Sequence, residues 1–173
     1  FMRCATAGYA SGRAVACGGA CYSFGHGVHG QLGHGVHELH EPQTQPRLIG
    51  ALRGQRAVAI SCGQQHSLVL TDGGALYSFG SGFAGKLGHG DQHDRHLPTA
   101  VSAKSFASIL GDDGRVGTIA AGAKHSLVAT RAGAVYTFGQ GTEHQLGHGL
   151  RRDEHSPRRV QGVLADVSVV QLA

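Results

Sequence analysis

The sequence predicts an all-β fold, a partial β-propeller of about three four-stranded blades, and two observations lead to this prediction. A glycine-rich block occurs three times, at residues 22–35, 77–90 and 136–149, beginning with Tyr-Ser-Phe-Gly or Tyr-Thr-Phe-Gly and ending with Leu-Gly-His-Gly. Short apolar segments flank each block, and no window longer than about ten residues has the period of a helix. Four short strands per unit, repeated in tandem, are typical of propeller blades.

The repeat divides the chain into units of unequal length. The glycine that follows the phenylalanine recurs after 55 and then 59 residues, so the variation in length falls in loops. The first unit is degenerate, because Ser11 stands where the other units have His66 and His125. The chain is thus one repeat domain, with units at about residues 1–56, 57–115 and 116–173.

The second unit shows the expected order of strands. The segment from Val58 to Ser61 is short, and larger apolar side chains alternate in it with smaller ones, which is typical of an inner strand. Gly63 then turns the chain into a second, apolar strand from His66 to Leu70. Asp72-Gly73 predicts a tight hairpin, because these residues accept the positive φ of a primed turn. The third strand returns from Ala75 to Phe79.

The remainder of each unit is an outer strand and a loop. The outer strand is weakly marked after a proline, at Arg47 to Ile49, Thr99 to Val101 and Arg158 to Val160. The glycine-rich block contains too many glycines for the interior of a strand, so we expect an ordered loop. Its buried anchors are Leu32, Leu87 and Leu146, and burial of one leucine contributes roughly 1.5 to 3 kcal/mol.

These motifs resemble the regulator of chromosome condensation repeat. In the second unit the family's pattern is followed by Cys62-Gly63, His66-Ser67, Asp72-Gly73, Tyr77 to Gly80 and Gly85 to Gly90. The resemblance covers essentially the whole chain. Two features depart from the family or from the other copies: phenylalanine replaces the usual tryptophan in all three copies, and His144 stands where Gly30 and Gly85 stand.

The resemblance implies a seven-bladed propeller, of which this chain supplies about three blades. We therefore expect the chain, which begins FMRCATAG, to be a fragment of a larger propeller. Open strand edges invite association. Either further blades or another chain should therefore cover the exposed edges.

Composition narrows the classes of function. The formal charge is +4 and the basic residues are dispersed, so an acidic partner is allowed but direct binding of nucleic acid is not expected. No apolar run approaches the ~18 residues of a membrane span. Four cysteines are too few for a disulfide scaffold in a chain of 173 residues, so we expect reduced thiols and an intracellular location in an unspecified compartment.

Thirteen histidines raise the question of a metal site. Three of them, His34, His89 and His148, occupy the same position in successive repeats, so they should lie side by side and not converge on one ion. We predict no metal site and no cofactor. The densest group is His26, His29, His34, His37 and His40.

The His-Ser pairs do not predict catalysis. Neighbouring residues of a strand point to opposite faces, so His66 cannot activate Ser67. We expect the ring of His66, like that of His125, to hold a neighbouring backbone group. Cys17 and Cys21, which align with a turn and a strand position, are expected to be small fillers. The loops also lack the ending of a phosphate-binding loop, and we expect no enzyme.

Partner specificity is expected in the irregular loops, because loops on a rigid scaffold commonly carry binding. We predict a noncatalytic scaffold for protein–protein interaction within a larger protein or assembly. The family resemblance implies an alternative, a guanine-nucleotide exchange factor for a Ran-type small GTPase with chromatin docking. The candidate partner-binding residues are Asp91, His93, Asp94, Arg95, Asp112, Asp113, Arg115, Arg151, Arg152 and Asp153, and a further insertion lies at residues 103–117.

Overall fold

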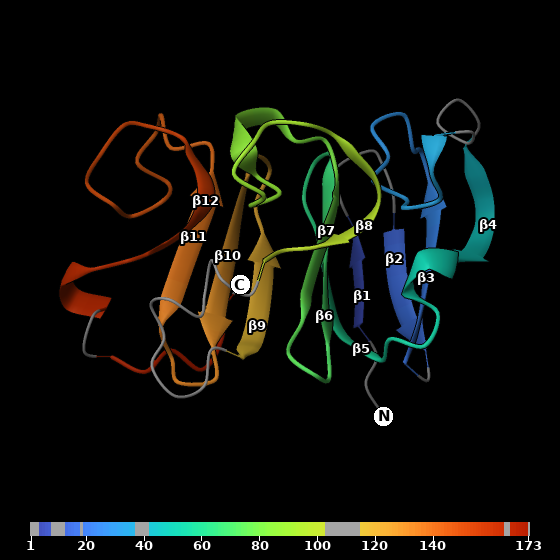
Figure 1. The fold of residues 1–173 in the computed structure, drawn as a ribbon, viewed down its shortest axis with the longest axis horizontal. Helices are drawn as coiled ribbons and strands as arrows, with labels where there is room; N and C mark the ends of the chain where they lie inside the picture. The colour runs from blue at the N-terminus through green and yellow to red at the C-terminus, as the bar shows by residue number, and fades with distance from the viewer. Residues whose placement is uncertain are drawn as a thin grey trace.

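Three four-stranded antiparallel sheets stand side by side in the computed structural model, which describes residues 4–7, 13–17, 19–36, 42–102, 115–164 and 167–172. Figure 1 shows them from blue through green to orange, with the strands of every sheet running in chain order. The all-β prediction of three four-stranded blades is confirmed. No helix in the described part of the chain is long and apolar enough to cross a membrane.

Each sheet takes four consecutive strands. Sheet A contains β1 (Cys4–Ala7), β2 (Arg13–Cys17), β3 (Ala20–Gly25) and β4 (Gln43–Leu48). Sheet B contains β5 (Ala57–Cys62), β6 (His66–Thr71), β7 (Leu76–Gly80) and β8 (Arg95–Ala100). Sheet C contains β9 (Val116–Ala121), β10 (His125–Thr130), β11 (Val135–Gly139) and β12 (Glu154–Arg159). Short 3-10 helices lie at η2 (Gly50–Leu52), η3 (Phe83–Gly85) and η4 (Gly162–Leu164).

The hairpin between the second and third strands differs from the predicted primed turn. In sheet B the positive φ lies at Gly74, at 82°, one residue later than the predicted turn residues. The Thr71 amide donates to Ala75 O, which leaves three residues in the loop. A three-residue hairpin loop commonly has a left-handed glycine at its end, and this explains the shift. In sheet A, Cys17 is the last residue of β2 and pairs with Ala20, so its predicted turn position is wrong.

The outer strands are longer than predicted and include the proline that was expected to precede them. Pro46, Pro98 and Pro157 lie inside β4, β8 and β12. Proline cannot donate to a ladder, but an edge strand has one side without a partner, where the missing amide costs nothing. The pairing of each outer strand also shifts in register next to the third strand.

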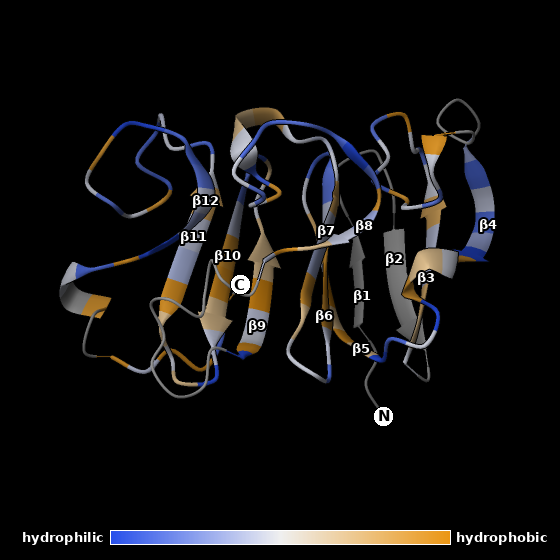
Figure 2. Ribbon diagram, in the orientation of Figure 1, coloured by the Kyte–Doolittle hydropathy of each residue, from blue (hydrophilic) through white to orange (hydrophobic). Residues whose placement is uncertain are grey.

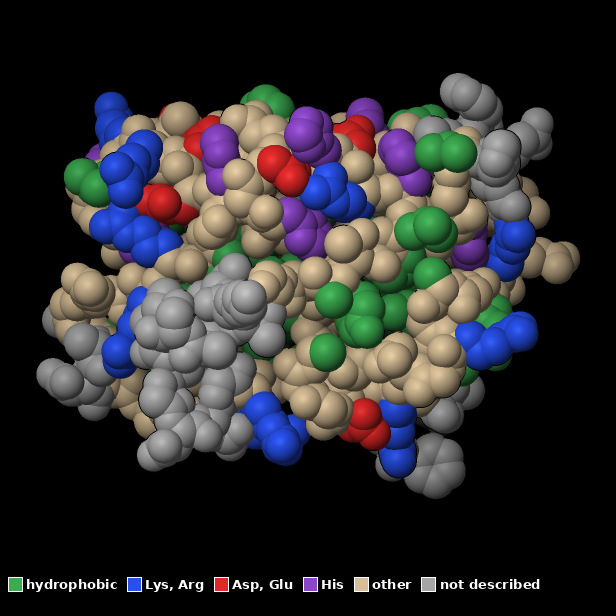
Figure 3. All heavy atoms as spheres, viewed as in Figure 1, with side chains coloured by type: hydrophobic (Ala, Val, Ile, Leu, Met, Phe, Trp, Pro, Cys, Tyr) green, Lys and Arg blue, Asp and Glu red, His purple; other side chains and the backbone are tan. Residues whose placement is uncertain are grey.

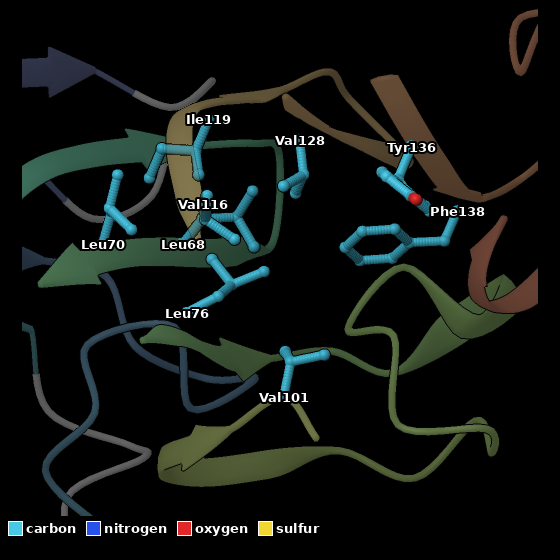
Figure 4. Packing of buried hydrophobic residues seen from close by; sticks show 9 residues of the cluster. All are labelled: Leu68, Leu70, Leu76, Val101, Val116, Ile119, Val128, Tyr136 and Phe138. Carbon is cyan, nitrogen blue, oxygen red and sulfur yellow. The ribbon is translucent and has the colours of Figure 1, made fainter. Parts of the chain in front are cut away.

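Both faces of sheet B are buried, because it packs between the other two sheets. Phe79 and Val69 face sheet A, whereas Leu68 faces sheet C. Figure 2 shows the apolar residues along β3, β9 and β10, and Figure 4 shows the cluster between sheets B and C. That cluster consists of Leu68, Leu70, Leu76, Val101, Val116, Ile119, Val128, Tyr136 and Phe138. The cluster between sheets A and B consists of Cys21, Ile49, Leu52, Ala57, Ile60, Val69 and Phe79.

Glycines of each loop allow the next sheet to approach. A Cβ on Gly88 would lie 2.8 Å from the Phe138 ring, and one on Gly85 would lie 2.4 Å from His155 Cα. Both glycines have φ of 77°, a conformation that other residues rarely adopt. The loop of one sheet therefore packs on the phenylalanine and outer strand of the following sheet.

The last described segment follows the path of another inner strand. The amide of Ala57 donates to Gly19 O, and in the same way the amide of Val169 donates to Gly133 O. Val169 and Leu172 pack on Val135 and Val160, whereas Val170 is 89% exposed. Residues 167–172 thus lie where β5 and β9 lie relative to their preceding sheets.

Candidate functional site

The glycine-rich loops lie together at one end of the sheets, which we call the loop end; the β6–β7 and β10–β11 hairpins lie at the opposite, hairpin end (Figure 1). Within each sheet a hydroxyl group of the third strand holds the loop. Ser78 Oγ donates to Leu87 O at 2.7 Å and accepts from His89 Nε2 at 2.9 Å. The same pairs recur as Ser23 with Leu32 and His34, and as Thr137 with Leu146 and His148. The three leucines are buried, as predicted.

Hydroxyl groups of the second strand join neighbouring sheets. Ser67 Oγ donates to Gln31 O in the loop of sheet A, and Ser126 Oγ donates to Lys86 O in the loop of sheet B. His66 Nε2 lies 2.9 Å from Ser126 Oγ. The prediction that His66 holds a neighbouring backbone group is therefore wrong, because its ring points to the next sheet and bonds a side chain there.

The His66–Ser126 contact is not an activated nucleophile. The serine proton is directed at the Lys86 carbonyl, so His66 must donate through Nε2 and cannot accept that proton. Both side chains are buried. Burial, followed by the charges of Lys86 and His125, lowers the pKa of His66 to about 3. The ring is thus a neutral structural donor.

The histidines do not assemble a metal site in the described ranges, where no three His, Cys, Asp or Glu side chains could share an ion. A hydroxyl group of the same sheet forms a hydrogen bond with Nε2 of His34, His89 and His148 in each case. His37 and His40 lie outside the described residues. Cys21 is a buried free thiol whose pKa is raised to about 12, first by burial and then by Cys62.

Three of the predicted residues of the 91–95 loop, Asp91, His93 and Arg95, form one network, whereas Asp94 binds the backbone of the glycine-rich loop. Arg95 Nη2 pairs with Asp91 Oδ2 at 2.7 Å, and Asp91 Oδ1 accepts the amide of His93 at 2.9 Å. That backbone hydrogen bond is the largest cause of the lowered pKa of Asp91. Asp94 Oδ1 accepts the amide of Gly82 at 2.8 Å. His93 Nδ1 lies 3.6 Å from Asp91 Oδ1, and the His93 side chain is 81% exposed to solvent.

The matching loop of sheet C repeats part of this network. Asp153 Oδ1 accepts the amide of Gly141 at 2.9 Å, as Asp94 does in sheet B. Arg152 Nε donates to Glu154, which also pairs with Arg158. Burial alone would raise the pKa of Glu154, but the hydrogen bonds from these two arginines outweigh it and lower the pKa. Figure 3 shows histidine, basic and acidic side chains intermingled on the upper half of this face, over the loops.

His144 changes the edge of sheet C. It has φ of 61°, which is unfavourable for a residue with a Cβ, and it stands where Gly30 and Gly85 touch the following sheet. Its Nε2 accepts a hydrogen bond from Arg151 Nε at 3.1 Å. A following sheet cannot approach this loop as closely as sheet C approaches Gly85.

The structure does not bring all candidate residues together. Arg115 precedes β9 at the hairpin end, where its side chain packs on Gly74. It is therefore far along the sheet from the 91–95 and 151–153 loops. Asp112, Asp113 and most of the predicted insertion lie outside the described residues.

Sequence reasoning missed three residues at the loop end between sheets B and C. Phe83 is 54% exposed, and the ammonium groups of Lys86 and Lys124 lie 5.9 and 6.0 Å from the centre of its ring. The signal was available as a departure from the repeat. Lys86 stands where the other loops have Gln31 and Gln145.

Comparison with protein families identifies the repeat. The model of the regulator of chromosome condensation (RCC1) repeat matches residues 18–70, 73–129 and 132–173, and a second model of the same repeat matches residues 57–86 and 118–145. Each of the first two segments begins at the hairpin before the third strand of a sheet. The segment 18–70 extends from β3 into β6, and the segment 73–129 extends from β7 into β10, so each joins two strands of one sheet to two of the next. The third joins β11 and β12 to the segment 167–172.

Among curated proteins, the chain is similar to the E3 ubiquitin-protein ligase HERC2 of Homo sapiens, with 36% identity over 91% of this chain and 3% of the ligase. It is also similar to the ultraviolet-B receptor UVR8 of Arabidopsis thaliana, with 34% identity over 90% of this chain and 33% of the receptor. The chain thus spans a third or less of these relatives.

Two solved structures have a similar fold. Human WBSCR16 superposes with a TM-score of 0.79 and 28% identity, over 96% of this chain and 43% of that one. Prp20p of Saccharomyces cerevisiae superposes with a TM-score of 0.74 and 23% identity, over 93% of this chain and 38% of that one.

Proposed function

Because this chain belongs to the regulator of chromosome condensation (RCC1) repeat family, we propose that it is a noncatalytic part of a β-propeller that mediates protein–protein interaction within a larger protein or assembly. One observation carries the proposal. The repeated hydroxyl groups and most of the repeated histidines that could suggest chemistry are engaged in holding loops or joining sheets. The irregular loop residues remain for recognition on a preformed frame.

The edges of the sheets support a role inside a larger structure. Val167 and Val170 are 52% and 89% exposed, although they belong to a segment placed like an inner strand. Apolar groups in such a position favour burial against further strands. We propose that additional blades or another chain cover this edge. Cys21 and Cys62 form no disulfide, which supports the further proposal of an intracellular location.

The relatives do not transfer an enzyme activity to this chain. Ligase activity is named for proteins of which this chain matches 3% to 15%. The exchange-factor alternative remains a prediction, because the 23% identity to Prp20p shows the fold alone.

The proposal is tested by comparing the two ends of the sheets. Tagged protein is used to capture partners from cells, and each captured partner is measured again with His93→Ser/Leu150→Ser. These two exposed residues lie in the β7–β8 and β11–β12 connections at the loop end. The matched control is Arg53→Ser/Gln55→Ser, two exposed residues at the hairpin end. We expect loss of the partner with the first variant alone. Equal capture by all three proteins, or acceleration of GDP release from a Ran-type GTPase, would overturn the proposal.

A further inference from the structure

The loop end between sheets B and C differs chemically from the equivalent place between sheets A and B. In the first sheet pair the three aligned positions hold Val28, Gln31 and Gln65, all without charge. Gln65 there bonds His29 at 3.1 Å. In the second pair the same three positions hold Phe83, Lys86 and Lys124. Three differences between the two sheet pairs therefore meet at one point.

These three side chains form a cationic aromatic cluster, which we call the Phe83 cluster. The ring of Phe83 lies within 6.0 Å of both ammonium groups, a distance at which a cation is attracted to the face of a ring. Phe83 and Lys124 are exposed, whereas Lys86 is 1% exposed. Phe83 and Lys124 can thus contact a ligand directly. The buried Lys86 attracts an anionic group of the ligand electrostatically, because the protein interior screens charge less than water does.

Asp94, the acidic residue beside the cluster, holds the loop of sheet B through a hydrogen bond. Asp94 interacts with Lys86, but its Oδ1 accepts the amide of Gly82, and Asp153 makes the same bond in sheet C, where Gln145 stands in place of Lys86. Burial lowers the pKa of Lys86 to about 8, with Asp94 opposing and Lys124 adding to the shift. Lys86 is thus still mostly charged at neutral pH. The cluster keeps a net positive charge next to an exposed ring.

We propose that the Phe83 cluster is a docking site for an acidic segment of a protein partner, with a carboxylate against Lys124 in the field of Lys86 and an apolar side chain on Phe83. This inference rests on the proposed scaffold function. The charge of the cluster is complementary to a carboxylate, and the half-exposed ring offers apolar area beside it. A nucleic acid fits less well, because the neighbouring arginines are paired: Arg95 with Asp91, and Arg152 and Arg158 with Glu154.

The test is a titration with a fluorescein-labelled decapeptide in which glutamate alternates with leucine, read by fluorescence anisotropy. Lys86→Gln/Lys124→Gln gives the cluster the residues of the first sheet pair and should weaken binding by roughly tenfold. Phe83→Thr, with the residue found at position 142, should weaken it by about fivefold. The thermal midpoint of each variant shows that the fold is retained.

A converse experiment moves the cluster. Val28→Phe/Gln31→Lys/Gln65→Lys should create a second site and raise the stoichiometry from one peptide to two. The site assignment is wrong if the decapeptide does not bind, or if the double lysine variant binds it as tightly as the native protein. Tighter binding of single-stranded DNA, lost in the same variant, would replace the peptide as occupant. These titrations need no cellular partner, so their failure leaves the capture experiment intact.

Discussion

His66 Nε2 lies 2.9 Å from Ser126 Oγ, and this hydrogen bond joins sheet B to sheet C in their buried interface. The same hydroxyl group donates to Lys86 O in the loop of sheet B. One serine therefore satisfies Nε2 of a buried ring and a buried carbonyl of the preceding sheet. The contact couples the core to the loop end that we propose as the interaction surface.

Removal of this serine should destabilise the protein. Ser126→Ala leaves the ring of His66 and the carbonyl of Lys86 without their partner in a buried place, which costs about 2 to 4 kcal/mol in the free energy of unfolding. Urea denaturation measures the loss. Ser156→Ala, at an exposed serine of β12, is the control and should change stability by less than about 0.5 kcal/mol. Equal effects of the two changes would contradict the role of the bond.

Stability should fall as the pH is lowered through about 6.5. Burial lowers the pKa of His66 to about 3 and also lowers the pKa values of His34, His89 and His148. The unfolded chain then takes up protons below about pH 6.5 that the folded chain does not, so the stabilisation present above that pH is lost toward the folded pKa values. Urea denaturation at a series of pH values between about 8 and 4 measures how the free energy of unfolding changes with pH.

The pH dependence can be assigned by substitution. His66→Gln should make the slope shallower, because one buried basic group is removed. His93→Gln, at an exposed histidine, should keep the slope of the native protein. A pH profile that is the same for both variants would mean that His66 does not contribute.

Packing between sheets should depend on Gly85 far more than on Gly149. Both have positive φ, 77° and 70°, so an alanine is strained by about 1 to 2 kcal/mol at either position. A Cβ at Gly85 would also lie 2.4 Å from His155 Cα, whereas nothing lies within 4 Å at Gly149. Gly85→Ala should therefore lower the free energy of unfolding by at least about 2 kcal/mol more than Gly149→Ala. Thermal or urea denaturation of the pair measures this difference directly.

The thiol of Cys21 should react slowly in the folded protein. It is 2% exposed, and burial is the main reason that its pKa is raised to about 12, so little thiolate exists at neutral pH. We expect iodoacetamide to label Cys62, which is partly exposed, before Cys21. Mass spectrometry of the labelled peptides follows both sites, and urea should remove the difference. Equal labelling rates without urea would show that the interface between sheets A and B opens readily.

The repeat, the four-strand order of each unit and the buried leucine of each loop could all be predicted from the sequence. These features depend on local composition and spacing: glycines exclude strand, short apolar segments favour it, and a tandem repeat requires similar units to pack alike. The sequence also excluded pairing of His66 with Ser67, since neighbours on a strand face opposite ways. The prolines within β4, β8 and β12 do not bound these strands as predicted, because an outer strand tolerates proline on the side that has no partner.

Contacts between side chains of different sheets could not be predicted from the sequence. His66 and Ser126 are 60 residues apart, and Phe83 and Lys124 are 41 apart, so their contacts follow from how sheet B packs on sheet C. Arg115, which directly precedes β9, contacts Gly74 of sheet B at the hairpin end and not the loop end. Composition and spacing act along the chain and fix each sheet, whereas the surfaces available to a partner arise between sheets, where packing sets the distances.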